Sequence, residues 1–444
     1  MSNICLLPVV IGGVLLLLAG ECSSQLAAGD RDTLVAIRKG WGNPRSLTSW
    51  DPASAIDHCS WDGVTCGGRV VTELSLHYMS LTGTVPAAVC DLANLTRLDL
   101  SYNDLSGAFP AATLYRCSRL RFLDLSNNGL DGALPHDIGS LSPAMEHLNL
   151  SMNSFSGTVP PAVASLPALR SLLLDTNGFT GAYPAAEIGK LAGLECLRLS
   201  GNEFAPAPVP VAFAKLTKLT YLGMSEMNII GEIREALSSL TELTLLDLSS
   251  NNLTGAIPAW VWRHEKLEYL YLYNNTLIGE LPRTVTAVNL IEIDLSINQL
   301  RGEMSEDFGN LRNLTFLSLY MNKITGTIPA SIWLLPELVL VRIQNNNFTG
   351  ALPAVISPNI QWIEMGNNMF SGSIPRTAIT LRGFWAENNQ LDCELPADMS
   401  KLASLTDLSV PDNRITGPIP ATIKLLLNLK SLNLSGNQLT GPIP

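Results

Sequence analysis

One phrase recurs along almost the whole chain: Leu-x-x-Leu-x-Leu-x-x-Asn-x-Leu-x-Gly-x-Ile-Pro, with conservative variants. Its Asn position falls at residues 79, 103, 128, 153, 177, 202, 227, 251, 275, 298, 322, 346, 368, 389, 413 and 437, a spacing of about 24 residues. A period of this length is typical of a solenoid, in which each repeat forms one coil and stability comes from stacking neighbours. The repeat therefore predicts one long structure of sixteen coils instead of two or three separate globular domains.

Each position of the phrase has a physical role. Leucines that flank one residue, such as Leu246 and Leu248, point inward from a short strand, so that Asp247 between them faces outward on the concave side. The amide of the following Asn251 is expected to bond backbone groups of its own coil and the adjacent one. Coils one and seven carry Met instead of Asn, so we expect them to lack this contact and to be looser. The pattern predicts an α/β repeat solenoid, a leucine-rich-repeat superhelix over residues 71–444 with an incomplete last coil.

The start of the chain resembles a secretion signal. Residues 5–20 carry no charge and end in four consecutive leucines, and small residues follow, which predicts a signal peptide over residues 1–24. A membrane anchor is the alternative, although the run is short for a span. No later stretch is long and apolar enough to cross a membrane. We therefore expect an extracellular protein, located in the apoplast, or at the outer face of the plasma membrane if the full protein has an anchor.

Composition and motifs exclude several functions. The chain has 28 Lys and Arg against 39 Asp and Glu, a net charge of -11, so it has no basic stripe for nucleic acid. Its five histidines are scattered, and no metal-binding His-Glu-x-x-His, Gly-x-Ser-x-Gly or phosphate-binding loop occurs. We expect no enzyme activity, no cofactor and no metal site.

Residues 25–70 differ in composition from the repeats and are expected to cap the open end of the solenoid. Asp30 or Asp32 is predicted to cap a short helix that stops near Gly42. Cys59 and Cys66 bracket a short loop, and in an oxidising compartment they are predicted to form a disulfide. Zinc binding is the weaker alternative, because no His or second Cys pair lies at zinc spacing.

The positions of the other cysteines in the repeat predict which of them can form a disulfide. Cys90 and Cys117 lie near one period apart, so they should stack on the convex side and form a second disulfide. Cys196 and Cys393 are separated by coils that span on the order of 40 Å, too far for a bridge. We expect them to be unpaired, with an intermolecular bridge as the alternative. Since Cys393 occupies a Gly position, either its turn is distorted or its thiol is exposed.

The residues resemble a known family. The helix and the Cys-Ser-Trp-Asp-Gly-Val-Thr-Cys segment at 59–66 resemble the plant-type N-terminal cap, and the Gly-x-Ile-Pro ending resembles the plant-specific repeat class. The phrases around Cys90 and Cys117 and around residues 344–375 are most similar to the HAESA-like receptor kinases. The resemblance covers residues 30–444 and implies a right-handed superhelix that perceives a secreted peptide or protein, with a co-receptor kinase ectodomain as a second partner.

The sequence also departs from that family. Kinase motifs are absent, and the chain stops at Pro444 inside a coil, so we expect the kinase and membrane span to be missing from this chain. Members carry an Arg-x-Arg doublet that holds the terminal carboxylate of a peptide. The nearest match is Leu340-Val341-Arg342, which agrees only in its second position, so anchoring of that kind is not expected here.

The outward strand positions of coils nine to fourteen are enriched in aromatic side chains. Large rigid rings beside fixed charges suit a binding surface, because the rings provide contact area and the charges fix the position of the ligand. Glu292, Asp294 and Glu364 lie among them in the register. The alternative is that the rings pack on one another. The predicted ligand-binding residues are Tyr269, Tyr271, Tyr273, Phe316, Tyr320, Arg342, Trp362 and Trp385.

Seven glycosylation sequons occur, at Asn94, Asn149, Asn252, Asn274, Asn313, Asn347 and Asn433. Asn149 and Asn433 occupy outward strand positions, where a glycan would block part of the concave face, and Asn274 adjoins the tyrosines.

Two alternatives to a receptor remain. One is a secreted inhibitor of microbial cell-wall-degrading hydrolases, similar to the polygalacturonase-inhibiting proteins, although these have about ten coils and a closing C-terminal cap. The other is a truncated receptor-like protein.

Overall fold

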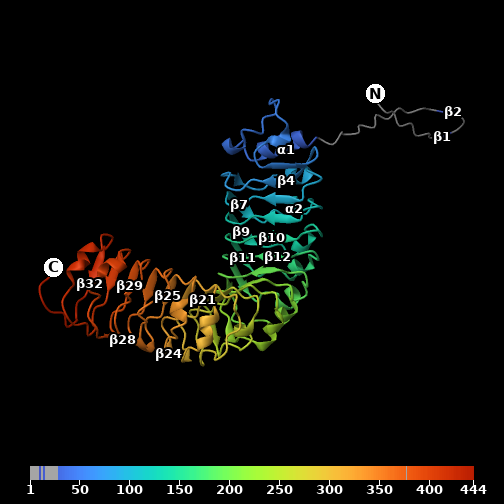
Figure 1. Ribbon diagram of the computed structural model, residues 1–444. Helices are drawn as coiled ribbons and strands as arrows, with labels where there is room; N and C mark the ends of the chain where they lie inside the picture. The colour runs from blue at the N-terminus through green and yellow to red at the C-terminus, as the bar shows by residue number, and fades with distance from the viewer. Residues whose placement is uncertain (1–9, 12–13, 16–28, 377) are drawn as a thin grey trace.

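The computed structural model describes residues 10–11, 14–15, 29–376 and 378–444. The predicted signal peptide lies outside these residues, apart from the paired strands β1 (Val10–Ile11) and β2 (Val14–Leu15). Within the described part of the chain, no helix has the length and apolar character needed to span a membrane. From residue 29 onward the chain forms one curved and twisting stack of coils, which confirms the predicted solenoid (Figure 1).

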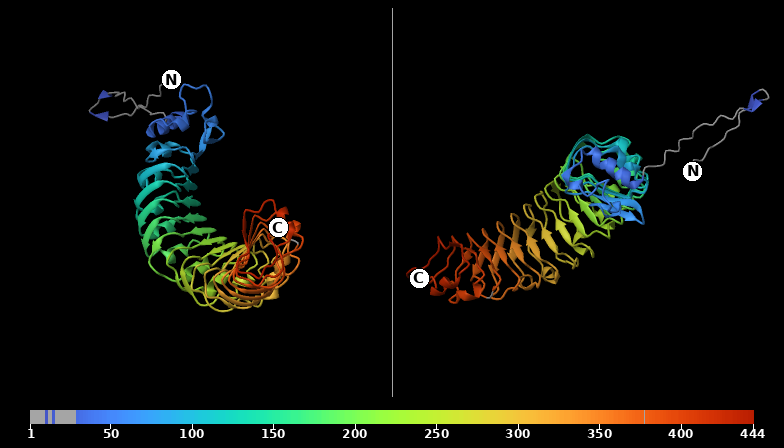
Figure 2. Two further views of the ribbon diagram at one scale, coloured as in Figure 1. Left: turned by 90° about the vertical axis from the view of Figure 1, so that its left-hand side faces the viewer. Right: turned by 90° about the horizontal axis from the view of Figure 1, so that it is seen from above.

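One strand of each coil pairs in parallel with the strand of the next coil, and together they form a continuous sheet along the inside of the curve (Figure 2). The sheet contains sixteen such strands, one for each predicted coil. The central residue of each strand is buried between outward neighbours, apart from exposed Leu432 in the last one, because alternate residues of a strand face opposite sides. The strands are β4 (Val70–Ser75), β6 (Arg97–Asp99), β8 (Phe122–Asp124), β10 (His147–Asn149), β12 (Ser171–Leu173), β14 (Cys196–Arg198), β16 (Tyr221–Gly223), β18 (Leu245–Asp247), β20 (Tyr269–Tyr271), β21 (Glu292–Asp294), β23 (Phe316–Ser318), β25 (Leu340–Arg342), β27 (Trp362–Glu364), β29 (Gly383–Trp385), β31 (Asp407–Ser409) and β32 (Ser431–Asn433).

A second set of short strands follows the Asn position of most coils. It forms three parallel groups, and the first break falls at coil six, where Pro206 and Pro208 provide no N–H for a ladder. Only an isolated bridge between Ala207 and Ile229 spans that break. The groups contain β5 (Thr82–Gly83), β7 (Asp104–Ala108), β9 (Gly129–Ala133), β11 (Ser154–Gly157), β13 (Gly178–Gly181) and β15 (Glu203–Phe204); β17 (Ile230–Glu232) and β19 (Asn252–Thr254); and β22 (Arg301–Gly302), β24 (Lys323–Thr327), β26 (Asn347–Ala351), β28 (Met369–Gly372) and β30 (Gln390–Leu391).

Short helical turns return the chain along the convex side of most coils. Between them and the large sheet lies one continuous hydrophobic core, mainly of aliphatic residues, in which Leu246 and Leu248 are fully buried as predicted. The turns are η3 (Ala87–Asp91), α2 (Ala111–Leu114), η4 (Ile138–Ser140), η5 (Pro161–Ser165), α3 (Ala185–Ile188), η6 (Val211–Lys215), η7 (Glu235–Ser239), η8 (Val261–Arg263), η9 (Glu306–Asn310), η10 (Ile332–Leu334), η11 (Met399–Leu402) and η12 (Ala421–Leu425).

The asparagines form the predicted ladder between coils. The side chain of Asn298, for example, donates to the carbonyls of Leu272, Leu295 and Ser296 and accepts from the backbone N–H of Leu277. Coil one, with Met79, lacks its own ladder amide as expected. Its backbone is nevertheless held, because the amide oxygen of Asn103 in coil two accepts from the N–H groups of both Met79 and Leu81. The expected loosening is therefore offset by the neighbouring coil.

The N-terminal cap contains α1 (Asp30–Gly40), η1 (Arg45–Leu47), η2 (His58–Ser60) and β3 (Val64–Gly67), and β3 pairs antiparallel with β4. The prediction that Asp30 or Asp32 caps the helix is wrong, since the N-cap residue is Gly29 and no side chain bonds there. The carboxylate of Asp30 instead accepts from the backbone N–H of Val71 at 2.7 Å, which ties the helix to the first coil.

Both predicted disulfides are present, Cys59 with Cys66 and Cys90 with Cys117. Cys196 and Cys393 are free, as expected. The thiol of Cys393 is exposed, and its residue lacks the positive φ that glycines adopt at this position. Strand β30 ends before it, so the turn is also altered.

Candidate ligand-binding face

The eight predicted binding residues all lie at outward positions of the large sheet, and all are half-buried. Pairing of β20 to β29 places them in columns across six coils. One column runs through Tyr269, Phe316 and Trp362, and the next through Tyr271, Arg342 and Trp385. Tyr273 and Tyr320 lie two residues beyond the second column on their own coils. The repeat register therefore identified one contiguous face, which we call the aromatic face.

At one end of the aromatic face, tyrosines pack beside a carboxylate. The rings of Tyr269 and Tyr271 lie 6.4 Å apart, and the Tyr271 hydroxyl donates to Glu292 at 2.6 Å. Burial and this hydrogen bond raise the pKa of the Tyr271 phenol far above its ordinary value. Tyr271 is thus a neutral donor held in a fixed orientation.

The centre of the face is organised around Arg342. Its guanidinium lies 5.0 Å from the ring centroid of Tyr320, and its Nε donates to Glu364 Oε2 at 3.0 Å. The amide nitrogen of Gln344 donates to the same Glu364 oxygen at 2.9 Å. The single arginine of the predicted site is therefore already paired with a carboxylate.

At the other end, two indoles stack. Trp362 and Trp385 have ring centroids 5.8 Å apart and an interplanar angle of 13°. The ring of Trp385 folds back over Gly383, where an added Cβ would overlap both indoles. The alternative that the rings pack on one another is thus partly correct, yet both side chains keep part of their surface open to solvent.

A small hollow of about 230 Å³ opens beside Trp385, lined also by Gln344, Glu364, Gly366 and Glu387. The predicted site included neither Gln344, Gly366 nor Glu387. They occupy the first position after the last inward residue of the strand, where half of the coils carry Ser, as at Ser249. The departure from Ser in coils twelve to fourteen is the sequence signal that could have identified them.

The outward strand positions of coils nine to fourteen carry four acids and one base. The acids are Glu292, Asp294, Glu364 and Glu387, and the base is Arg342. Burial raises the pKa of the Asp294 carboxyl, against the opposing hydrogen bonds from Ser296. The face therefore has an acidic character, and Glu387 has no hydrogen-bond donor or ion-pair partner among the described residues.

The concave sheet carries a second cluster that the sequence reasoning missed, in coils two to four. The Arg97 guanidinium lies 3.4 Å from the centroid of the Phe122 ring, and Phe122 stacks on His147 at 4.2 Å. Burial lowers the pKa of the His147 imidazole. The side chains of this cluster stack on one another, so we retain the aromatic face as the candidate site.

The predicted glycosylation sites differ in access. Asn252, Asn274, Asn313, Asn347 and Asn433 are exposed, and Asn94 is half-buried. Asn149 is 8% exposed, and its amide nitrogen donates to Asp124 at 2.8 Å. Attachment of a glycan to Asn149 would break that bond, so a glycan fits the other six positions better.

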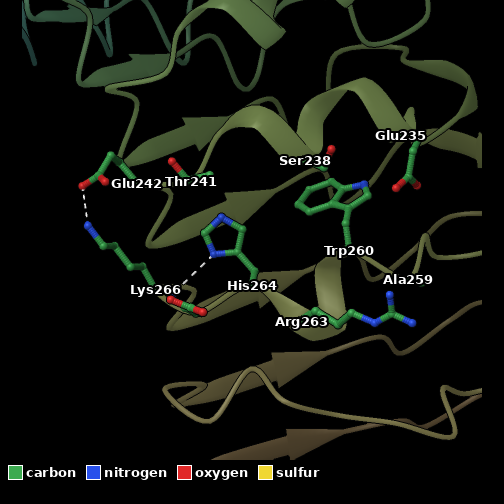
Figure 3. Close-up of a pocket in the computed structure, with 10 residues that line it drawn as sticks. Glu235, Ser238, Thr241, Glu242, Ala259, Trp260, Arg263, His264 and Lys266 are labelled. Carbon is green, nitrogen blue, oxygen red and sulfur yellow. Dashed lines mark hydrogen bonds and ion pairs between the residues drawn. The ribbon is translucent and has the colours of Figure 1, made fainter.

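A larger hollow of about 530 Å³ lies off the concave sheet, between η7 and η8 (Figure 3). His264 spans its floor, with Nε2 bonded to the Leu240 carbonyl and Nδ1 accepting from the backbone N–H of Lys266. The Lys266 ammonium pairs with Glu242. These groups are occupied by structural contacts and do not converge on a reacting centre.

Models of known families match most of the chain. The leucine-rich repeat region matches residues 75–366, the leucine-rich repeat N-terminal domain matches residues 27–67, and a further leucine-rich repeat matches residues 428–444.

The chain is similar to several plant proteins. It is 32% identical to the ectodomain of the Arabidopsis receptor kinase HAESA, solved with an IDA peptide hormone, with a TM-score of 0.86 over 94% of this chain and 74% of that one. A HAESA complex with IDA and the co-receptor SERK1 matches with a TM-score of 0.53 at 28% identity, over 94% of this chain and 87% of that one. Among Arabidopsis sequences, the receptor protein kinase EMS1 is 37% identical over 68 residues, and polygalacturonase inhibitor 1 is 40% identical over 70 residues; each match covers 15% of this chain. These sequence matches span only 6% and 21% of the respective relatives.

Proposed function

The chain belongs to the leucine-rich repeat family, and we propose that it is the extracellular ligand-recognition region of a plant cell-surface receptor. In this proposal, a secreted peptide or protein binds the aromatic face, and binding initiates signalling. The observation that carries the proposal is the contiguous set of half-exposed rings and charges on six adjacent concave strands. The likeness to an ectodomain solved with a peptide hormone supports a peptide or protein as the class of ligand.

A co-receptor kinase ectodomain is proposed as a second partner. The support is the HAESA complex, which contains both a peptide hormone and the co-receptor SERK1.

The experiment is a capture of secreted peptides by purified protein, followed by synthesis of the retained peptide and calorimetry. We expect Tyr271→Ala, Tyr320→Ala and Trp362→Ala each to weaken its binding by about tenfold or more, because a few large aromatic side chains carry most of the binding energy of such interfaces. Tyr78→Ala is the matched control, an exposed tyrosine of coil one outside the aromatic face. Unchanged affinity in all three variants would exclude this face.

The second candidate is a secreted inhibitor of microbial cell-wall-degrading hydrolases, supported by the match to polygalacturonase inhibitor 1. Assays of fungal polygalacturonases with and without the purified protein separate the two functions. Inhibition that persists in the three aromatic variants would favour the inhibitor and place its surface elsewhere.

A further inference from the structure

We propose that the hollow beside Trp385 receives a lysine or arginine side chain of the ligand, an inference that rests on the proposed function of the aromatic face. The hollow of about 230 Å³ is lined by two carboxylates, one amide and one indole. None of its lining groups is a cation. A cationic side chain is therefore the ligand group with which its chemistry is complementary.

The hydrogen bonds at the hollow leave acceptors available. Gln344 donates through its amide nitrogen to Glu364 Oε2, which fixes the orientation of the amide and leaves its oxygen without a donor. Arg342 donates to the same Oε2. Across the described residues, neither the second oxygen of Glu364 nor either oxygen of Glu387 has a hydrogen-bond donor. Of these acceptors the Gln344 oxygen is buried, and a buried acceptor without a donor costs stability, so a ligand that supplies an N–H group is favoured.

The position of Glu387 depends on a glycine. A Cβ added to Gly366 would overlap the Glu387 carboxylate, so this carboxylate lies directly over the backbone of the adjacent coil. The glycine therefore permits the second acidic wall of the hollow.

The charge of the surroundings favours the same ligand. The only base of the face, Arg342, is paired with Glu364, and the remaining acids attract a cation while they repel an anion. Trp385 adds an aromatic wall, which can attract a cation through its ring or contact the methylene stem of a long basic side chain.

A bound metal ion is less suited to these residues. Among the described residues, the only cluster of His, Cys, Asp or Glu at metal-binding distances is His58 with Cys59 and Cys66, and those two cysteines form a disulfide. Glu364 and Glu387 belong to no such cluster, so an organic cation is the expected occupant.

The test uses N-acetyl-arginine amide as the probe and its neutral isostere, N-acetyl-citrulline amide, as the comparison. The eight tryptophans are replaced by 5-fluorotryptophan, and the fluorine resonance of position 385 is assigned with Trp385→Phe. We expect the arginine probe to shift this resonance with a Kd of about 1 mM, typical of a ligand of this size. The citrulline probe is expected to bind about tenfold more weakly.

Glu387→Gln should weaken binding of the arginine probe by about tenfold, since it removes a charge-assisted hydrogen bond. Gly366→Ala should weaken it as well, by displacing Glu387. The control is Glu394→Gln, an exposed carboxylate of the same coil that lies off the hollow. Circular dichroism confirms that each variant is folded.

Three results would overturn the proposal: equal responses to arginine and citrulline, an arginine response that survives Glu387→Gln, or no response at about ten times the expected Kd. A shift of the same resonance by calcium chloride alone would assign the hollow to a metal ion instead. If Tyr271→Ala abolishes binding of the captured ligand while the arginine probe fails, the cation subsite is wrong and the proposed function stands.

Discussion

The side-chain oxygen of Asn251 accepts a hydrogen bond from the backbone N–H of Met227 at 3.0 Å, although the two residues belong to different coils. The same oxygen accepts from the N–H of Ile229 at 2.9 Å. Met227 is the residue that replaces Asn in the ladder of coil seven, and the residues on both sides of it, Glu226 and Asn228, have positive φ. Coil eight thus satisfies the backbone N–H groups of coil seven, which lacks its own ladder asparagine. Coil seven has two residues in a left-handed conformation at this turn, Glu226 and Asn228, where a coil with Asn has one.

Asn251→Ala should therefore destabilise the protein more than Asn298→Ala. Both asparagines donate to three carbonyls, but Asn298 accepts from one backbone N–H and Asn251 from two. We expect a loss of about 2 kcal/mol for Asn298→Ala and about 1 kcal/mol more for Asn251→Ala, because each orphaned buried group has a cost of this order. Hydrogen exchange should show the extra loss at the amides of Met227 and Ile229. Equal protection of these two amides from exchange in both variants would contradict the stabilisation of coil seven by Asn251.

The period of the sequence was sufficient to predict the fold and most of the face. Because each coil repeats the same inward positions, the alternation that buries Leu270 also determines that Tyr269 and Tyr271 point outward. The number of coils and the disulfide between Cys90 and Cys117 follow from the same register. Identification of the aromatic face required only that the outward positions be read in order.

Other features depend on contacts that a period does not encode. The carboxylate of Asp30 could accept a hydrogen bond from the first turn of its own helix or from a distant N–H group. Only the packing of the cap against β4 determines that the donor is the N–H of Val71. Likewise, the fold of the Trp385 ring over Gly383 is a choice of side-chain rotamer. Glu387 was missed although Tyr273 and Tyr320, at the same position of coils nine and eleven, were included, because the period does not show that its carboxylate lines the hollow beside Trp385.

Gly383→Ala should separate the two indoles without straining the backbone. The new methyl group would overlap Trp385 and Trp362, while the φ of this glycine is not in the left-handed region. We expect a loss of about 1–3 kcal/mol from the forced repacking, and a reduced near-ultraviolet dichroism signal from the indole pair. In the control Gly193→Ala, the added carbon meets only the Leu169 carbonyl at 3.7 Å. An unchanged dichroism spectrum in Gly383→Ala would contradict the stacking.

The two free thiols should differ in reactivity. Cys393 is exposed, whereas burial raises the pKa of the Cys196 thiol and disfavours the reactive thiolate. Native protein treated with a maleimide at mildly alkaline pH should be labelled at Cys393 about tenfold faster or more. Peptide mapping of the labelled protein provides the measurement, and unfolded protein, in which both thiols are accessible, provides the reference. Comparable native rates would show that Cys196 is open to solvent.

His147 should make the fold less stable in acid. Burial lowers the pKa of its imidazole, partly opposed by Asp124, so the folded protein binds a proton less readily than the unfolded chain, whose histidine has a value near 6.5. Stability is therefore retained above that value and falls as the pH decreases below it. His147→Phe keeps an aromatic ring against Phe122 but removes the titrating group, so its stability should fall less between about pH 7 and about pH 5. The measurement is the urea midpoint of both proteins across this range, and parallel pH dependences would show that His147 does not contribute.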